Sequence, residues 1–130
     1  MKVLIAGGTD FSDQDFMAYR LGSLHNVYNF SLILLGHPPG SRGTELLALS
    51  WAKENDMPYH CMRNEKKASR QAIYALNEKP EMVVFFPGKP SEYLKALFRL
   101  TRLREFPYVR YHYNSELASK NDTWRGVYVW

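Results

Sequence analysis

The chain has 130 residues, which is enough for one domain with its own core. Its hydrophobic content of 45% excludes an intrinsically disordered chain, and its longest apolar runs are too short to cross a bilayer. The net charge of +4 is mild: it suits a phosphate-bearing ligand, and nucleic acid is not expected as a partner.

The few residues with redox, metal or targeting chemistry point to an ordinary cytoplasmic location. Cys61 is the only cysteine, which excludes an internal disulfide and fits a reducing compartment. The four histidines do not pair with it at metal-ligand spacing, so neither a metal nor a cofactor is expected. Met1 and Lys2 lead directly into an apolar run without a signal-peptide layout.

Short apolar runs alternate with helix-like segments, which is typical of an α/β protein. In chain order we predict strand 2–6, helix 13–27, strand 31–35, helix 43–55, strand 59–62, helix 66–78, strand 82–86, helix 91–105 and strand 108–112. Ser12 or Asp13 is expected to cap the first helix, and Ser91 the last. Because the strands are continuous apolar runs, we expect a mostly parallel sheet of about five strands with helices on both faces.

Helical periodicity predicts which side chains face this sheet. The expected inward sets are Met17, Leu21, Leu24 and Tyr28; Leu47, Ala48, Trp51 and Ala52; Ser69, Ala72, Ile73 and Leu76; and Leu94, Leu97, Phe98 and Leu103. On another face of the last helix, Lys95, Arg99 and Arg102 form a basic stripe that we expect to be solvated.

Three glycine-bearing turns follow the strands at 2–6, 31–35 and 82–86. Since parallel strands end at one edge of their sheet, these turns are expected to gather there. Glycine permits close approach to the backbone, and helix N-termini offer N–H groups to an anion. The expected ligand contacts are Gly7, Gly8, Thr9 and Asp10 in the first turn, Gly40, Ser41, Arg42, Gly43 and Glu45 in the second, and Pro87, Gly88, Lys89, Ser91 and Glu92 in the third.

Each turn also has a purely structural interpretation. Gly7 and Gly8 fit a tight strand-to-helix turn with Asp10 as a local cap. Arg42 and Lys89 fit solvated side chains in loops. The sequence contains neither a nucleophile elbow nor a phosphate loop ending in Gly-Lys-Ser/Thr.

In their order and spacing, these motifs resemble the SLOG superfamily, most closely its small branch related to YspA and CpYpsA. Gly7-Gly8-Thr9-Asp10-Phe11 corresponds to the motif Gly-Gly-Arg-Asp-Phe of that branch. Gly40-Ser41-Arg42-Gly43-Thr44-Glu45, followed by Ala48 and Trp51-Ala52, stands for Gly-Ala-Arg-Gly-Ala-Asp followed by Ala and Trp-Ala. Arg70-Gln71 stands for Arg-Asn, and Phe86-Pro87-Gly88-Lys89-Pro90-Ser91 for Phe-Pro-Gly-Gly and its following Gly-Thr.

The resemblance spans about residues 1–112 and implies a Rossmann-like domain that binds a nucleotide or a nucleotide-derived ligand. It adds Phe11, Arg70 and Gln71 to the expected contacts. Ser41, Arg42, Arg70 and Ser91 would hold phosphate or ribose oxygens, while Asp10 and Glu45 would orient the loops or accept from hydroxyls. By analogy we also expect a homo-oligomer, with the aromatic extension 113–130 packed on the domain or on a neighbouring subunit.

Departures from the family pattern bear on function. Thr9 replaces an arginine, and Pro38-Pro39 replace glycines. Lys95 stands where related Lonely-Guy-like enzymes, which remove a base from a nucleoside monophosphate, have a glutamate. The sequence thus favours ligand binding for sensing or sequestration over catalysis. Two alternatives remain: a hydrolase or N-glycosidase that uses Glu45 or Glu92, and an interaction module that uses the basic stripe and the extension.

Overall fold

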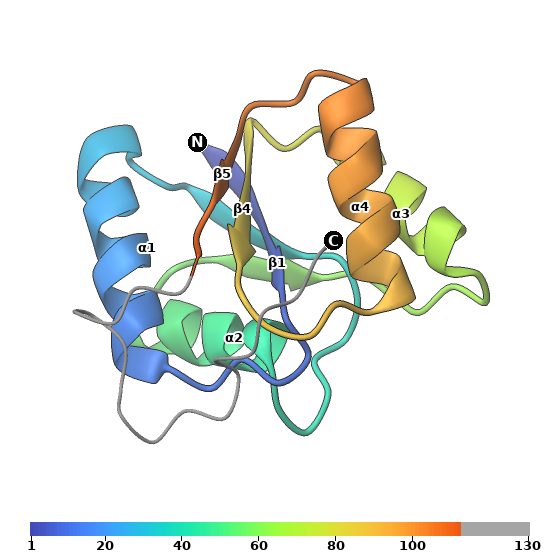
Figure 1. Ribbon diagram of the computed structural model, residues 1–130. Helices are drawn as coiled ribbons and strands as arrows, with labels where there is room; N and C mark the ends of the chain where they lie inside the picture. The colour runs from blue at the N-terminus through green and yellow to red at the C-terminus, as the bar shows by residue number, and fades with distance from the viewer. Residues whose placement is uncertain (113–130) are drawn as a thin grey trace.

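Strands and helices alternate through residues 1–112, the part of the chain described by a computed structural model (Figure 1). The extension 113–130, with its predicted packing, lies outside the described residues. In chain order the elements are β1 Lys2–Gly7, α1 Gln14–Tyr28, β2 Leu32–Leu35, α2 Thr44–Glu54, β3 Tyr59–Cys61, α3 Ala68–Asn77, β4 Met82–Phe86, α4 Glu92–Leu103 and β5 Tyr108–Arg110. Every predicted strand and helix is therefore confirmed, with small shifts at the ends.

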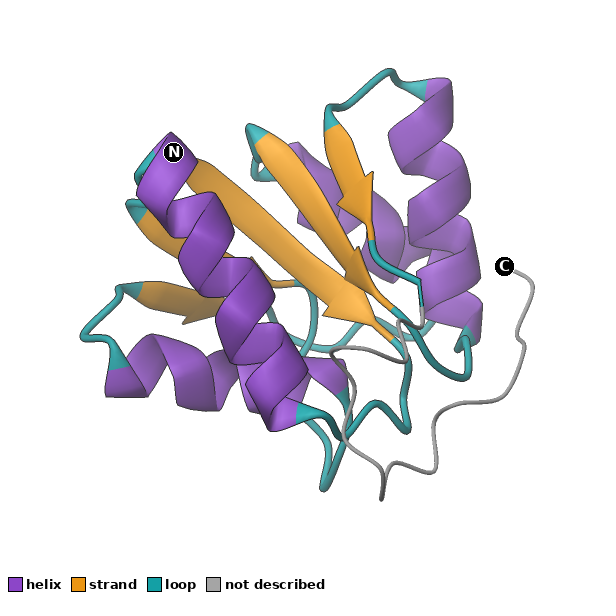
Figure 2. Ribbon diagram, turned by 60° about the vertical axis from the view of Figure 1, so that its left-hand side comes forward, coloured by secondary structure: helices purple, strands orange, loops and turns teal. Residues whose placement is uncertain are grey.

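The five strands form one parallel sheet in the order β3-β2-β1-β4-β5. β1 occupies the centre, where Ile5 pairs with Leu35 on one side and Gly7 pairs with Phe86 on the other. All strands point toward the same edge of the sheet (Figure 2). The predicted fold class, a Rossmann-like three-layer sandwich, is confirmed.

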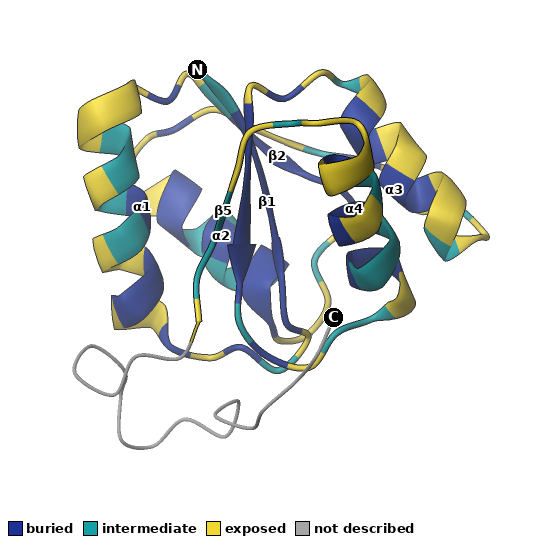
Figure 3. Cartoon of the chain, turned by 45° about the horizontal axis from the view of Figure 1, so that its top comes forward, coloured by how far each residue is buried: buried dark blue, intermediate teal, exposed yellow. Residues whose placement is uncertain are grey.

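Helices cover both faces of the sheet and bury a separate core on each. On one face α1 and α2 pack against side chains that include Val3 and Ile5, and on the other α3 and α4 pack against Leu4 and Ala6. Neighbouring residues of β1 thus point to opposite faces, and the side chains on both faces are buried under helices. Figure 3 shows the buried strands between helices that expose only their outer sides. This double coverage explains the continuous apolar runs of the sequence.

Two helix starts follow the predicted capping. Asp13 Oδ1 accepts from the Phe16 amide at 2.9 Å, which decides between Ser12 and Asp13 as the cap of α1. Ser91 Oγ accepts from the Leu94 amide at 3.1 Å and caps α4. α2 differs, because its N-cap is Gly43 and no side chain caps it.

Four of the predicted inward positions are wrong. Ser69 and Ile73 are exposed, since α3 turns Gln71, Ala72, Ala75 and Leu76 inward and Ile73 stands roughly 130° from the centre of that face at 100° per residue. Leu103 is 75% exposed because it lies roughly 180° around the helix from the buried Leu94. Tyr28 shares a face with Met17, but it is the last residue of α1 and is 46% exposed.

Candidate functional site

The loops after β1 and β4 lie side by side at the carboxyl edge of the sheet. The chain moves outward from β1 through β2 to β3 and then crosses back to β4 on the other side of β1. The strand order therefore reverses between β1 and β4, and ligands of open α/β sheets bind outside the carboxyl ends of the strands at such a point. Figure 2 shows the loops gathered at this edge, as predicted.

Direct hydrogen bonds join these two loops. The amides of Gly8 and Thr9 donate to the carbonyl oxygens of Phe86 and Lys89 at 3.3 and 2.9 Å. The Lys89 amide in turn donates to Asp10 Oδ1 at 2.7 Å. Asp10 thus orients the loops, one of the two roles expected for it. Backbone groups of these loops that were expected to face a ligand are thus bonded to each other.

The loop between β2 and α2 joins the same cluster through Thr44. Both the amide and the hydroxyl of Thr44 donate to the Gly8 carbonyl oxygen, at 3.2 and 3.0 Å. The Thr44 side chain is fully buried. Its contribution was missed because a threonine at the first position of a helix carries no distinctive sequence signal.

The glycines of the turns allow the loops to approach one another. A Cβ atom at Gly7 would lie 2.7 Å from the Phe86 carbonyl oxygen, and one at Gly8 would lie 2.6 Å from that of Pro87. Gly43 and Gly88 have φ values of 106° and 125°, which other residues rarely adopt. All four are buried, whereas Gly40 is exposed and has open space around it. Loop packing, the structural interpretation of the sequence, accounts for the four buried glycines.

The outer surface of the loops is polar and exposed. Thr9, Ser41, Arg42, Lys89 and Glu92 are exposed, while Pro87 and Ser91 are half-buried. The Thr9 hydroxyl donates to the Lys89 carbonyl oxygen at 3.3 Å, and Glu92 lies 3.4 Å from Lys95 Nζ. Ser41 and Arg42 precede Gly43, the N-cap of α2, and no side chain caps this helix. The Thr44 amide at its start already donates to the Gly8 carbonyl oxygen, and the positive end of the helix dipole attracts anions there.

Two of the expected contact residues, Phe11 and Gln71, have buried side chains. Phe11 is completely buried between the rings of Phe16 and Phe86, at centroid distances of 6.1 and 5.3 Å. Gln71 Nε2 donates to the carbonyl oxygens of Gly36 and Arg63, the latter at 2.9 Å. Gln71 thereby ties α3 to the loops after β2 and β3. Its neighbour Arg70 is exposed on α3.

A polar cluster that the sequence did not predict lies at the end of β2. His37 Nε2 is 3.5 Å from Glu45 Oε1, and His37 Nδ1 is 2.8 Å from the Pro38 carbonyl oxygen. With an acceptor near each ring nitrogen, the surroundings favour the doubly protonated form of the imidazole. Burial alone would lower the pKa of His37, but the hydrogen bond and charge of Glu45 and the Pro38 carbonyl outweigh it, so the pKa is raised above 6.5.

Tyr93 completes this cluster from α4. Its ring meets the His37 imidazole edge to face at a centroid distance of 4.9 Å. The Tyr93 hydroxyl is buried and has no hydrogen-bond partner among residues 1–112. Burial and the charge of Glu45 raise the pKa of this hydroxyl well above its usual value, so it stays protonated. A side chain at Gly36 would overlap the hydroxyl, which explains the glycine at that position.

One hollow lies away from the loops. It has a volume of about 120 Å³, sits between α1 and α2, and is lined by side chains that include Met17, Leu47 and Trp51. None of the predicted contact residues lines it. Within the described part of the chain, His, Cys, Asp and Glu side chains form no group of three that could hold a metal ion. No helix of residues 1–112 is both long and apolar enough to span a membrane.

Comparison with known proteins does not extend this description. No model of a known protein family matches the chain, and no curated protein matches it significantly. The resemblance to the SLOG superfamily therefore remains a prediction from the motifs.

Proposed function

We propose that this chain binds a phosphate-bearing small molecule of the nucleotide class on the outer surface of the three loops, for sensing or sequestration. One observation carries the proposal. The exposed Ser41 and Arg42 lie beside the uncapped start of α2, in a loop that Thr44 ties to the switch point of the sheet. Dipole, hydroxyl and guanidinium together favour a phosphate group.

The buried glycines bear on where such a ligand would lie relative to the loops. Because Gly8, Gly43 and Gly88 pack loop against loop, the ligand would lie over the loops rather than between them. Exposed Lys89 and Arg42 would then supply the positive charge from two different loops. An arginine holds phosphate through two parallel N–H groups, and a lysine does so as a point charge.

Isothermal titration calorimetry tests this proposal with mono-, di- and cyclic nucleotides and ADP-ribose. We expect one of these to bind, and Arg42→Ala to weaken its binding about tenfold or more, since charge-assisted hydrogen bonds contribute about 1.5–3 kcal/mol. Arg104→Ala, which removes an exposed guanidinium at the far end of α4, should leave binding unchanged. The proposal fails if no compound binds, or if Arg42→Ala binds like the wild type.

The arrangement of carboxylates bears on the hydrolase alternative. Glu45 is buried beside His37 and near Tyr93, whereas Glu92 is exposed and paired with Lys95. If the chain cleaves nucleoside monophosphates, Glu45 is the carboxylate positioned for proton transfer. Release of free base, measured by chromatography and abolished by Glu45→Gln but not by Glu92→Gln, would favour this alternative over binding alone.

A further inference from the structure

Charge is divided between the two helical layers of the sandwich. The layer of α3 and α4 includes two segments, 63–70 and 92–104, that together contain eight Lys and Arg residues and two carboxylates. The segment 10–56, which contains α1 and α2, has six carboxylates and three Lys and Arg residues. These opposite charges partly cancel, so the net charge of the whole chain is small although its two helical layers differ in charge.

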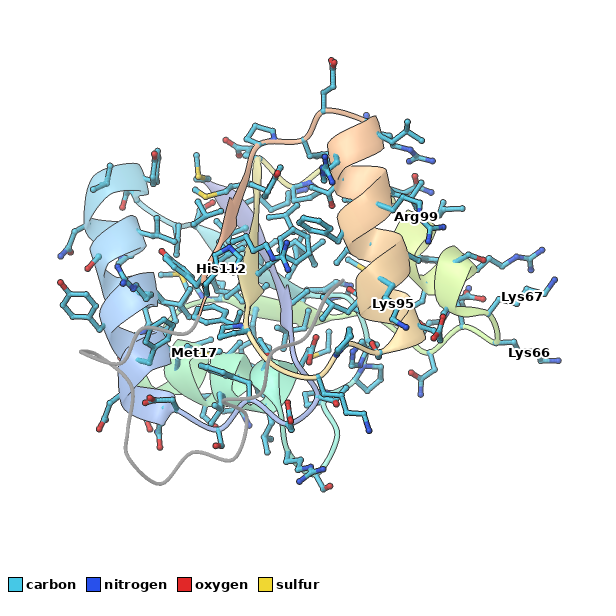
Figure 4. The ribbon with its side chains drawn as sticks, in the orientation of Figure 1. Met17, Lys66, Lys67, Lys95, Arg99 and His112 are labelled. Atoms are coloured by element: carbon cyan, nitrogen blue, oxygen red, sulfur yellow. The ribbon has the colours of Figure 1, made fainter. Side chains whose placement is uncertain are left out.

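The eight cations are brought together by the fold. α3 and α4 pack side by side on one face of the sheet, so cations from two distant parts of the chain share one layer. Figure 4 shows Lys66 and Lys67 at the start of α3 and Lys95 and Arg99 on α4, all on this side of the sheet. We call this surface the basic face. It consists of Arg63, Lys66, Lys67, Arg70, Lys95, Arg99, Arg102 and Arg104, of which all but the half-buried Lys95 are exposed.

Most of these charges are not neutralised within the described residues. Two ion pairs lie on the basic face, Arg63 to Glu65 at 4.0 Å and Lys95 to Glu92 at 3.4 Å. The other six cations have no carboxylate within ion-pair distance in residues 1–112. Burial, and in part the nearby charge of Arg102, lowers the pKa of Arg110 on the adjoining strand β5. Like charges on one face repel one another, and a bound anion would reduce this repulsion.

One exposed ring on this face, that of Tyr74, suits a base of a nucleic acid. Tyr74 is 37% exposed on α3, and Arg63 Nη2 donates to its hydroxyl at 2.9 Å with the guanidinium 5.6 Å from the ring centre. Aromatic rings and guanidinium planes are the groups on which unpaired bases stack. The opposite layer suits this face less well in a second copy, because three of its six carboxylates, Asp10, Asp13 and Glu45, are already bound within the chain. Only Asp15, Glu54 and Asp56 are left exposed to meet eight cations.

We infer that the basic face binds the phosphate backbone of a nucleic acid. The domain's pI of about 9.2 and the clustering of Lys and Arg on one layer are the electrostatic signature of such a surface. This inference does not rest on the proposed nucleotide site, since Arg42 and Lys89 belong to other loops.

Fluorescence anisotropy with labelled oligonucleotides of about 20 nucleotides tests the inference, with single-stranded DNA, single-stranded RNA and duplex DNA measured in parallel. We expect binding that weakens about 20-fold for a single strand and about 40-fold for duplex DNA between about 50 and 200 mM NaCl, as for roughly three neutralised phosphates. The double variant Lys67→Glu/Arg99→Glu should lose binding at least tenfold. Both side chains are exposed, and a glutamate at the start of α3 favours the helix, so the variant should fold.

Matched controls separate the basic face from net charge. Lys53→Glu on α2 changes the net charge as much as the single variant Arg99→Glu, but on the opposite layer. Lys53→Glu should bind almost like the wild type, as should Arg99→Lys, whereas Arg99→Glu should weaken binding. Arg42→Ala should also retain oligonucleotide binding, which keeps this test independent of the nucleotide site. The inference is overturned if no oligonucleotide binds at low salt, if Lys53→Glu loses as much binding as Arg99→Glu, or if sedimentation shows that the double variant only disrupts self-association.

Discussion

Asp10 and Lys89 are 79 residues apart in the chain, yet Asp10 Oδ1 accepts a hydrogen bond from the Lys89 amide at 2.7 Å. This bond connects the loops on the two sides of the point where the strand order reverses. It fixes the separation of the loops over which we propose that the ligand lies.

Asp10→Ala should lower the free energy of unfolding by about 1 kcal/mol, because it removes an acceptor of the Lys89 amide. Asp10→Asn retains an oxygen at that position and should lose clearly less. Urea denaturation of the three proteins measures the difference. Equal stability of Asp10→Ala and the wild type would show that the bond does not hold the loops.

Gly8→Ala should destabilise the chain by about 1–3 kcal/mol or prevent folding, because the new Cβ would lie 2.6 Å from the Pro87 carbonyl oxygen. Gly22→Ala provides the opposite case, since Gly22 lies within α1 and has nothing within 4 Å of its Cβ position. That change should stabilise the chain by about 1 kcal/mol. Thermal unfolding followed by circular dichroism measures both. A tolerated Gly8→Ala would contradict the close packing of the loops.

His37 should make stability depend on pH. Its folded-state pKa is raised above 6.5, so the ion pair with Glu45 stabilises the fold fully below about pH 6.5 and loses this effect as the pH rises through the folded-state value. The stability difference between the wild type and His37→Gln should therefore be largest in acid and shrink toward alkaline pH. Chemical denaturation at a series of pH values measures it. A difference that grows with pH would have the wrong sign for this pair.

Tyr93→Phe should leave stability unchanged or raise it by about 1 kcal/mol, because the hydroxyl that it removes is buried and has no partner among the described residues. Thr101→Val is the matched comparison. It removes a buried hydroxyl that donates to the Leu97 carbonyl oxygen at 2.7 Å, and it should cost about 1 kcal/mol. Calorimetric unfolding compares the two variants. A clear loss in Tyr93→Phe would mean that its hydroxyl has a partner in solution.

The sequence predicted the fold well because the buried strands leave a strong local signal. A run such as Val83-Val84-Phe85-Phe86 has few alternatives to a strand covered on both faces. Helix faces were harder to predict. Gln71 is polar and buried, whereas Ile73 is apolar and 37% exposed. A prediction from hydrophobicity alone therefore placed the wrong residues of α3 on the buried face. The deciding contacts of Gln71 are with the loops after β2 and β3, which local periodicity does not reveal.

The candidate site was predictable in its location but not in its internal bonding. Parallel topology alone brings residues 7–11, 40–45 and 87–92 to one edge. Two features of its bonding depend on side-chain geometry between different segments of the chain. One is the pair of hydrogen bonds from Thr44 to the Gly8 carbonyl oxygen, and the other is the pairing of His37 with Glu45 beside Tyr93. The basic face has the same origin, since its two segments become neighbours only when α3 packs on α4.

The central position of β1 also affects how the protein forms during synthesis. β1 leaves the ribosome first, but one of its two neighbours in the sheet is β4, whose residues 82–86 are made about 80 positions later. At about 5–20 residues per second, this delay is about 4 to 16 s. During that interval one side of β1 has no partner strand. A translational pause between residues 35 and 82 would lengthen the exposure of this apolar strand.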